Sequence, residues 1–342
     1  LNCLNFSPSL MSLRHRSKND WGRLDMTSEL SSLCSYAKGK VSVDTLSKRN
    51  YVSTENMMPN KGGIVDAGAL PSAQYTQQYI KDDILVSNIR PYFKKIWMAD
   101  DDGGCSNDVL VFRADRGCDS TFLYYILAND AFFNYASATS KGTKMPRGDK
   151  TAIMQYKVPC FNYETQLRIG KLLRSIDDRI AVNKKINDNL QQQLFSLYEN
   201  MATASPCLKE YTLSNLCDFQ EGYVNPPQTH PEYFDGEVKW LRAVDINESF
   251  IIETSRTLTK AGFESAKKSA LLFEPNTIAI SKSGTIGRLG IIADYMCGNR
   301  AVINIAPHDT NMLAFIYCFL KSKQREFPDM AVGSVQKNLY VS

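Results

Sequence analysis

Residues Tyr163–Met201 read YETQLRIGKLLRSIDDRIAVNKKINDNLQQQLFSLYENM, and this stretch sets the organisation of the whole chain. Apolar side chains recur in it at alternating intervals of four and three residues, the spacing of a coiled-coil helix. Two asparagines occupy the centre of this seam. We predict one long helix whose seam consists of Ile169, Leu173, Ile176, Ile180, Asn183, Asn187, Leu190, Leu194, Leu197 and Met201.

The predicted helix has the composition of an exposed spacer that needs a partner. No Pro or Gly follows Gly170, and polar residues fill most positions outside the seam. At about 1.5 Å per residue the segment would span roughly 58 Å, longer than a small domain is wide. Because a buried amide must find a polar group, we expect Asn183 and Asn187 to fix the register against a second helix. The alternative is a helix that packs only on its own domain.

The overall composition is that of an ordinary folded protein with room for two domains. The chain has 342 residues, 43% of them hydrophobic, and a formal net charge of +4. Its longest nearly unbroken apolar run, Leu313–Leu320, is too short to cross a bilayer, and its first residues lack the apolar segment of a secretory signal. We therefore expect a cytoplasmic protein without a membrane partner. The weakly basic charge permits nucleic-acid binding without demonstrating it.

The sequence predicts no catalytic residue, no metal site and no cofactor. Its nine cysteines contain no CxxC pair, its three histidines are scattered, and neither a GxxxxGK[ST] loop nor a glycine-rich cofactor loop is present. The segment Asn225-Pro226-Pro227-Gln228 resembles the Asn-Pro-Pro-aromatic signature of amino-methyltransferases. Gln228 stands where that signature has its aromatic ring, so we interpret the diproline as a rigid loop.

The sequence on one side of the long helix repeats on the other side. Four segments recur in the same order with nearly constant shifts: Leu30–Cys34 as Leu213–Cys217 (shift 183), Asp83–Ser87 as Thr277–Ser281 (194), Cys105–Asn107 as Cys297–Asn299 (192) and Phe122–Leu127 as Phe315–Leu320 (193). Any one match could arise by chance, but four in order indicate two copies of one domain.

Each copy is predicted to be a mixed α+β domain. Short β-type runs with Gly, Asp and Asn turns fill its first two-thirds, and one helix follows, near Asp119–Asn134 in the first copy and Thr310–Arg325 in the second. The predicted divisions are a poorly defined extension (1–25), a first domain (26–160), the helical spacer (161–203) and a second domain (204–342). The second copy reaches Ser342 without a second long helix. We therefore expect the partner helix to come from a longer chain or from another subunit.

Two repeated loops carry the side chains that suit DNA. One loop follows a predicted strand in each copy, and the other is a basic or amide-bearing segment with a glycine. Lys and Arg can neutralise phosphates and read guanine, and Asn and Gln can read adenine edges. Ordinary polar turns are the alternative for each loop taken alone. The candidate DNA contacts are Ser87, Asn88, Arg90, Lys94, Lys95, Lys141, Lys144, Arg147, Ser281, Lys282, Ser283, Thr285, Arg288, Gln336 and Lys337.

The chain resembles the DNA-specificity (S) subunits of type I restriction-modification systems. The residues that carry this resemblance are Tyr51–Met57, Asp83–Pro91, Ser175–Ile180 with Asn183–Asn187, Trp240–Arg242 and Ser281–Gly287. The resemblance implies two target-recognition domains that each read one half of a split DNA sequence, joined by long helices that pair antiparallel. It also implies that methylating M subunits and, for cleavage, R subunits dock on a scaffold that has no catalytic centre of its own.

Two other functions fit parts of the sequence. A DNA methyltransferase or a remnant of a fused restriction enzyme would bind S-adenosylmethionine, but the glycine-rich cofactor loop is absent. A coiled-coil scaffold whose flanking domains bind protein would show no DNA affinity that depends on Lys141, Lys144, Lys282 or Arg288. The bases that are recognised cannot be predicted, because readout depends on which side chains reach the base edges.

Overall fold

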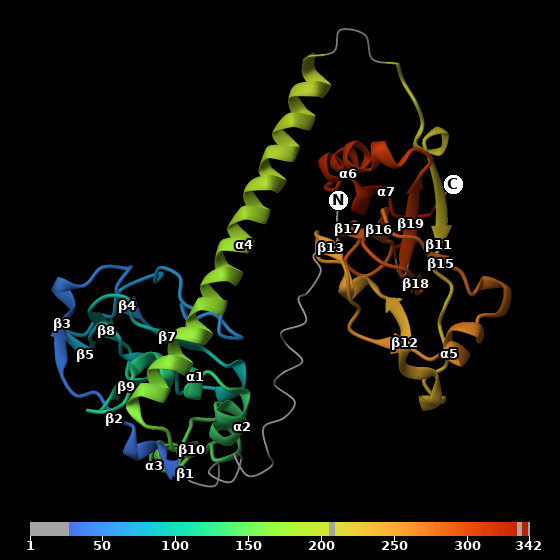
Figure 1. Ribbon diagram of the computed structural model, residues 1–342. Helices are drawn as coiled ribbons and strands as arrows, with labels where there is room; N and C mark the ends of the chain where they lie inside the picture. Colours follow the sequence, from blue (N-terminus) through green and yellow to red (C-terminus); the bar gives the residue numbers. More distant parts are fainter. Residues whose placement is uncertain (1–26, 205–208, 334–336, 341–342) are drawn as a thin grey trace. The chain divides into compact units, whose positions relative to one another are not determined.

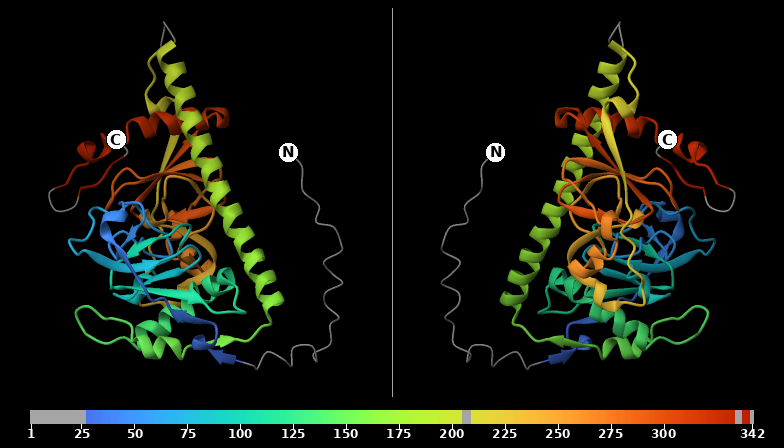
Figure 2. Two further views of the ribbon diagram at one scale, coloured as in Figure 1. Left: turned by 90° about the vertical axis from the view of Figure 1, so that its left-hand side faces the viewer. Right: turned by 90° about the vertical axis from the view of Figure 1, so that its right-hand side faces the viewer.

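The computed structural model describes residues 27–204, 209–333 and 337–340. The predicted extension (1–25) and Gln336 lie outside these residues. The chain divides into two compact units between Lys184 and Lys185, inside one long helix, α4 (Tyr163–Ala204). This helix runs without a break in Figure 1 and Figure 2 and confirms the predicted long helix.

From residue 27 to the start of α4, the first unit contains two four-stranded sheets, a short strand pair and three short helices. One sheet has the order β2-β9-β6-β7, and the other has the order β3-β5-β8-β4. The strands are β1 (Thr27–Glu29), β2 (Cys34–Tyr36), β3 (Lys40–Ser42), β4 (Tyr51–Val52), β5 (Tyr75–Tyr79), β6 (Ile84–Ser87), β7 (Ile96–Met98), β8 (Gly103–Cys105), β9 (Val109–Ala114) and β10 (Lys157–Pro159). The helices are α1 (Ser120–Leu127), α2 (Asp130–Ala138) and α3 (Lys150–Met154).

Strand β6 lies in the middle of the first unit and is buried on both of its faces. Its side chains alternate, as strand geometry requires: Ile84 and Val86 pack with the helices, and Leu85 packs against the second sheet. The neighbouring strand β9 repeats the pattern, with Phe112 on the helix side and Val111 on the other. The central sheet is therefore the middle of three layers, which explains its nearly continuous apolar sequence.

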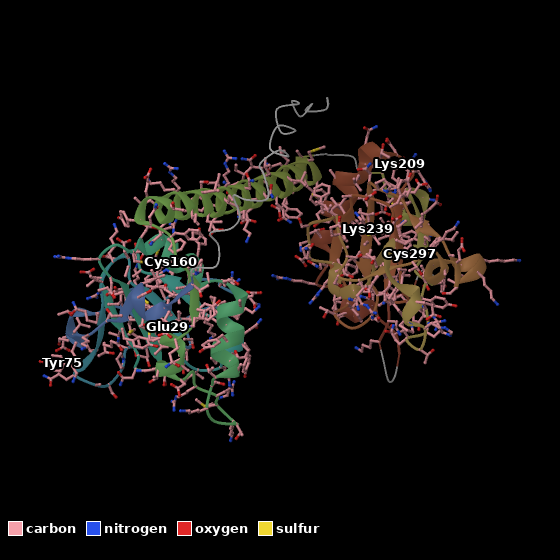
Figure 3. All side chains as sticks on the ribbon, turned by 60° about the horizontal axis from the view of Figure 1, so that its bottom comes forward. Glu29, Tyr75, Cys160, Lys209, Lys239 and Cys297 are labelled. Atoms are coloured by element: carbon pink, nitrogen blue, oxygen red, sulfur yellow. The ribbon has the colours of Figure 1, made fainter. Side chains whose placement is uncertain are left out.

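The second unit is built in the same way, except that one of its sheets has a fifth strand and, among the described residues, it has no separate two-stranded pair. Its sheets have the orders β11-β19-β16-β17-β13 and β14-β12-β18-β15. The strands are β11 (Cys217–Glu221), β12 (Phe234–Leu241), β13 (Phe250–Ile251), β14 (Thr257–Leu258), β15 (Leu272–Phe273), β16 (Thr277–Ser281), β17 (Leu289–Ile292), β18 (Met296–Gly298) and β19 (Val302–Pro307). The helices are α5 (Lys260–Glu264), α6 (Leu313–Ser322) and α7 (Phe327–Met330). In Figure 3 the labelled Cys297 lies among these strands.

Strand pairing confirms the internal repeat and corrects one of its shifts. Ser87 pairs with Val109 in the first unit, and Ser281 pairs with Val302 in the second, so the shift of 194 at this strand holds. Cys105 pairs with β4, and the corresponding residue beside β12 is Gly298, not Cys297. The true shift here is therefore 193 (298 minus 105). Matching Cys105 with Cys297, because both are cysteines, had displaced the sequence alignment by one residue.

The predicted helices are present, but the first is divided. Asp119 caps α1 by accepting the amide proton of Phe122 at 2.8 Å, as expected for an N-cap. The segment expected to continue to Asn134 ends at Leu127, because Asn129 caps a new helix, α2, through the amide of Ala131. In the second unit α6 lies inside the predicted range, after a 3-10 turn at Thr310–Met312.

The two ends of α4 each pack on a domain, and its middle is exposed. Near its start Gln166 is buried, accepts from the amide of Asp119 at 3.1 Å and donates to the carbonyl of Phe161 at 2.9 Å. Near its end Phe195 packs against the core of the second unit, and the ring of Tyr198 lies 5.3 Å from that of Phe315. The alternative of a helix packed only on its own domain therefore holds for its ends and not for its centre.

Candidate nucleic-acid interface

The loop that follows β6 and the loop that follows β16 are each shaped by a buried serine. The hydroxyl of Ser87 donates to the carbonyl of Ile89 at 3.0 Å. The hydroxyl of Ser281 donates to the carbonyl of Thr285 at 2.5 Å and accepts from the amide of Arg288 at 2.8 Å. Both side chains are buried, so these two predicted contact residues fix the loop backbone in the structure.

The two predicted loops of the first unit form one site. The carbonyl of Asn88 accepts from the amide of Gly148 at 3.1 Å, and the amide of Arg90 donates to the carbonyl of Pro146 at 2.8 Å. The second loop closes on itself through two backbone bonds of 2.9 Å between Lys141 and Arg147. We call residues 87–95 together with 139–150 loop site 1.

The second unit joins its two loops in the same way. The carbonyl of Lys282 accepts from the amide of Leu339 at 3.0 Å, and Val332 and Asn338 exchange two backbone bonds of 3.0 Å. Gly142 and Gly333 occupy matching positions in the two hairpins, and both have positive φ, which favours glycine. We call residues 281–288 together with 331–340, without 334–336, loop site 2.

Three of the six predicted cations of loop site 1 are paired with carboxylates of the same domain. Lys94 lies 2.8 Å from Asp130, Lys141 lies 2.5 Å from Asp149, and Arg147 lies 3.0 Å from Asp108. The ammonium group of Lys95 donates to a backbone carbonyl, that of Thr54, at 2.6 Å. Lys144 is exposed at the end of the hairpin.

These ion pairs lower the pKa values of two of the carboxyl groups. Hydrogen bonds from Lys61 and Lys94 lower the pKa of Asp130 to about 2. A hydrogen bond from Lys141, with the amides of α3, likewise lowers the pKa of Asp149. Ionised carboxylates therefore face the lysines of loop site 1 at neutral pH.

Lys282 is the central cation of loop site 2 and is largely covered. Its ammonium group lies 2.7 Å from the carboxylate of Glu221, which also accepts from the hydroxyl of Tyr223 at 2.9 Å. Burial raises the pKa of Glu221, but the hydrogen bonds from Lys282 and Tyr223 outweigh it and the net pKa is lowered. The ring of Tyr340 lies 5.4 Å from the same ammonium group, within cation–π range.

The remaining predicted residues of loop site 2 occupy different environments. Ser283 and Arg288 are partly buried, and Thr285 and Lys337 are exposed. Burial raises the pKa of Glu248, but the hydrogen bonds from Lys321 and Gln324 and, less strongly, the charges of Lys321 and Arg288 outweigh it and the net pKa is lowered. Gln336 lies outside the described residues.

Two buried polar atoms of loop site 1 have no hydrogen-bond partner among the described residues. They are the side-chain carbonyl oxygen of Asn88 and the Nε of Arg90. A Cβ at Gly148 would lie 2.9 Å from that oxygen, so the glycine lets the hairpin approach the amide closely. Buried polar atoms without a partner are costly and rare in native proteins, which sets these two atoms apart from the rest of loop site 1.

The predicted seam of α4 is divided between packed ends and an exposed centre. Ile169 packs on the first core, and Leu173 and Leu194 are partly buried. The exposed positions include the two asparagines and four apolar side chains: Ile176 (47%), Ile180 (49%), Asn183, Asn187, Leu190 (57%) and Leu197 (61%). Ile186, which the seam did not include, is also exposed at 48%.

A profile of the type I restriction modification DNA specificity domain matches residues 26–192 and 208–342. The chain belongs to this family. The two matched regions contain the two repeated domains, and the first also includes most of α4.

This chain is similar to solved structures of specificity subunits. The S subunit of a type I restriction-modification system from M. genitalium is 19% identical, with 89% of this chain and 78% of that chain covered and a TM-score of 0.54. The HsdS subunit from Thermoanaerobacter tengcongensis is 17% identical, with 92% and 84% covered and a TM-score of 0.39. The first of these supports the arrangement of two α+β domains with a long helix between them.

Several residues of the loop sites were not predicted from the sequence. Glu221 and Tyr340 enclose Lys282, and Asp108, Asp130 and Asp149 hold the cations of loop site 1. Apart from Asp149, they lie outside the predicted loops, so only the fold could bring them there.

Two further observations concern the described residues alone. Within residues 27–204, 209–333 and 337–340, no group of three or more His, Cys, Asp or Glu side chains is placed to hold a metal ion. No helix in the same part of the chain is long and apolar enough to span a membrane.

Proposed function

We propose that this chain reads a DNA sequence made of two half-sites, one with each domain. The observation that carries this proposal is the recurrence of one composite site: in both units the loop after the central strand is hydrogen-bonded to a glycine-bearing hairpin. Two equivalent sites on two copies of one domain suit two half-sites of a split target, and half-sites one helical turn apart lie about 34–36 Å from each other on DNA.

We further propose that the chain positions methyltransferase (M) and restriction (R) subunits on that target and catalyses no step itself. The predicted domain limits at residues 26, 160 and 204 belong to this proposal, as do the individual DNA contacts. In loop site 1 the exposed ammonium group of Lys144 is available to contact a DNA phosphate. In loop site 2 Lys282 is paired with Glu221, and it contacts a phosphate once DNA displaces that carboxylate.

The test is to co-express the full chain with its genomically adjacent methyltransferase and to map the methylated adenines. We expect methylation at a split sequence with two specified parts. Lys282→Ala and Lys144→Ala should each weaken DNA binding and lower methylation of the whole target, and each should reduce the salt slope of binding by about one counterion. Lys260→Ala is the matched control, because Lys260 is an exposed lysine of α5 outside both loop sites. Unchanged methylation in both loop variants would contradict the assignment of these loops.

We propose that a second long helix covers the exposed centre of α4. The exposed apolar side chains Ile176, Ile180, Ile186 and Leu190 support this proposal, since such a face is costly in water. In the family resemblance these helices pair antiparallel, which also gives the exposed Asn183 a polar partner.

The helix proposal predicts an assembly larger than the chain itself. Glu at both Ile176 and Ile180 should abolish this assembly in sizing with light scattering, whereas Lys185→Glu, an exposed change on the same helix, should not. A wild-type chain that is monomeric and protected from hydrogen exchange along this face would contradict the proposal.

A further inference from the structure

The loop of site 1 carries two exposed aromatic side chains that the predicted DNA contacts do not include. They lie in a 3-10 turn, Pro91–Phe93, between β6 and β7. Tyr92 is 51% exposed and Phe93 is 39% exposed, and their ring centroids are 4.7 Å apart. We call residues 91–93 the aromatic turn.

The backbone around the aromatic turn is held in an unfavourable conformation. Arg90 and Lys94 flank it with φ of 51° and 52°, in the left-handed region that non-glycine residues rarely adopt. A second turn at Asn60 and Lys61, with φ of 54° and 62°, supports it. Strain of this kind persists only where the surroundings impose it, and it gathers at ligand-binding sites.

Several contacts impose this conformation. The amides of Asn60 and Lys61 donate to the carbonyls of Phe93 and Lys94, each at 2.8 Å. Asp130 then joins the two turns, since its carboxylate lies 2.7 Å from Lys61 and 2.8 Å from Lys94. The two rings are therefore held outward by a fixed backbone, which reduces the entropy lost when they bind.

The charges around the rings indicate the class of partner. Two lysines share the single carboxylate of Asp130, and the ammonium group of Lys95 lies 6.0 Å from the ring of Phe93. The surroundings are therefore net positive. Aromatic side chains among cations are the combination that contacts bases and phosphates together, whereas a purely apolar patch would suit a protein partner.

We propose that Tyr92 and Phe93 form a wedge that enters the base stack of duplex DNA beside the half-site read by the first domain. This inference rests on the proposed function. The aromatic turn belongs to loop site 1, because Arg90 directly before it donates to the hairpin at Pro146. Apolar side chains inserted at a base step unstack it and kink the duplex.

The proposal makes the two half-sites unequal. Residues 282–288, which follow β16 as residues 88–94 follow β6, contain no aromatic residue. Tyr340 belongs to the hairpin of loop site 2, where its ring covers Lys282. The wedge therefore distorts DNA at the first domain only, and it reads how easily the local sequence unstacks, which is indirect readout.

The test uses the full chain and a duplex enriched by that chain from a random pool. The duplex carries a donor and an acceptor dye at its ends, so that its bend is measured together with the affinity. Tyr92→Ala combined with Phe93→Ala should weaken binding at least about five-fold, the low end of what loss of one aromatic–base stack costs. The complex should also become straighter. The salt dependence should stay unchanged, because no charge is removed.

Tyr75→Ala is the matched control. Tyr75 lies at the edge of the first unit in Figure 3, on β5, and is 54% exposed. It should leave affinity and bend unchanged, and circular dichroism should show that both variants fold.

The possible results separate the wedge from the proposed function. If the wild-type chain binds the duplex and the double variant binds it with the same affinity or the same bend, the wedge alone is overturned. The aromatic turn then contacts a protein partner or lies on the DNA surface without entering the base stack. Failure of the wild-type chain to enrich any duplex overturns the proposed function and the wedge with it.

Discussion

After β6 the first domain places Pro91, Tyr92 and Phe93 in a rigid 3-10 turn, whereas after β16 the second domain places Gly284 and Gly287, both with positive φ. These two segments begin at equivalent serines and are anchored by equivalent backbone bonds to a hairpin. The comparison separates what the domain needs to form a loop site from what it presents there. Backbone hydrogen bonds build the site, and the side chains between the anchors differ.

The two copies also differ in which side chains fill the interior beneath the loops. In the first domain Cys105 is a buried side chain of β8, and its counterpart in the second domain is Gly298. The ring of Phe273 takes up the space there, because a Cβ on Gly298 would lie 2.3 Å from it. Equivalent backbones therefore enclose different cores.

Exchange of this residue should give the largest effect. Gly298→Cys puts the first domain's residue into the second, where it meets the fully buried Phe273, and we expect it to lower the free energy of unfolding by about 3 kcal/mol. Urea unfolding followed by fluorescence and circular dichroism measures it.

Gly68→Ala controls for the added carbon, because nothing lies within 4 Å of a Cβ there. We expect it to change the free energy of unfolding by no more than about 0.5 kcal/mol. A Gly298→Cys variant as stable as this control would show that the second core adapts, and the two domains would then be more alike than their packing indicates.

The two loop serines should differ in a smaller way. Ser281→Ala removes a buried hydroxyl with two backbone partners, Thr285 and Arg288, and should cost about 2 kcal/mol. Ser87→Ala removes one such bond, to Ile89, and should cost about 1 kcal/mol. Thermal unfolding of both variants measures the difference. Equal losses would mean that the two hydroxyls hold their loops equally.

Much of this framework was predictable from the sequence, because the repeat fixes it twice. The coiled-coil spacing of α4, the strand that ends in Ser87 or Ser281 and the glycine of each hairpin were all identified in advance. Periodicity and turn residues report local structure, and these features are local.

The carboxylates of the loop sites were not predictable for the opposite reason. Glu221 belongs to β11 and reaches Lys282 because β11 and β16 both pair with β19. Asp130 reaches Lys94 across 36 positions in the chain. Nothing in the local sequence distinguishes such acids from other surface acids, and only the assembled domain brings them to the cations. The sequence-based shift at Cys105 was wrong by one residue for the same reason. Strand pairing, and not the identity of a single residue, decides which positions of the two domains correspond.

Release of Lys282 should affect DNA binding modestly. Glu221→Gln removes the carboxylate that holds this lysine, so we expect DNA affinity to rise by roughly two- to five-fold and the salt slope to steepen by about one counterion. Fluorescence anisotropy at several salt concentrations measures both.

Glu253→Gln is the control for net charge, because Glu253 pairs with Lys239 away from loop site 2. The same gain in both variants would mean that overall charge, and not the freed lysine, increases the affinity. A gain in affinity confined to Glu221→Gln would show that the ion pair with Glu221 keeps Lys282 from contacting DNA fully in the wild-type chain.

The smallest effect concerns the contact of Asp130 with Lys61 and Lys94 in the first domain. Hydrogen bonds from Lys61 and Lys94 lower the pKa of Asp130 to about 2, below the ordinary value of about 3.9. A carboxyl whose folded-state pKa is depressed stabilises the fold fully above its unfolded pKa and loses that contribution as pH falls through its folded pKa. The contact between the two left-handed turns should therefore weaken between about pH 4 and pH 2, seen as faster amide exchange at Asn60 and Lys61.

Lys61→Ala should raise the pKa of Asp130, measured from its carboxyl carbon shift, and move this loosening to higher pH. Arg49→Ala, which removes an exposed cation outside this contact, should not. If Asp130 titrates at its ordinary value in the wild-type chain, the two lysines do not hold it, and the strained backbone alone must keep the aromatic rings in place.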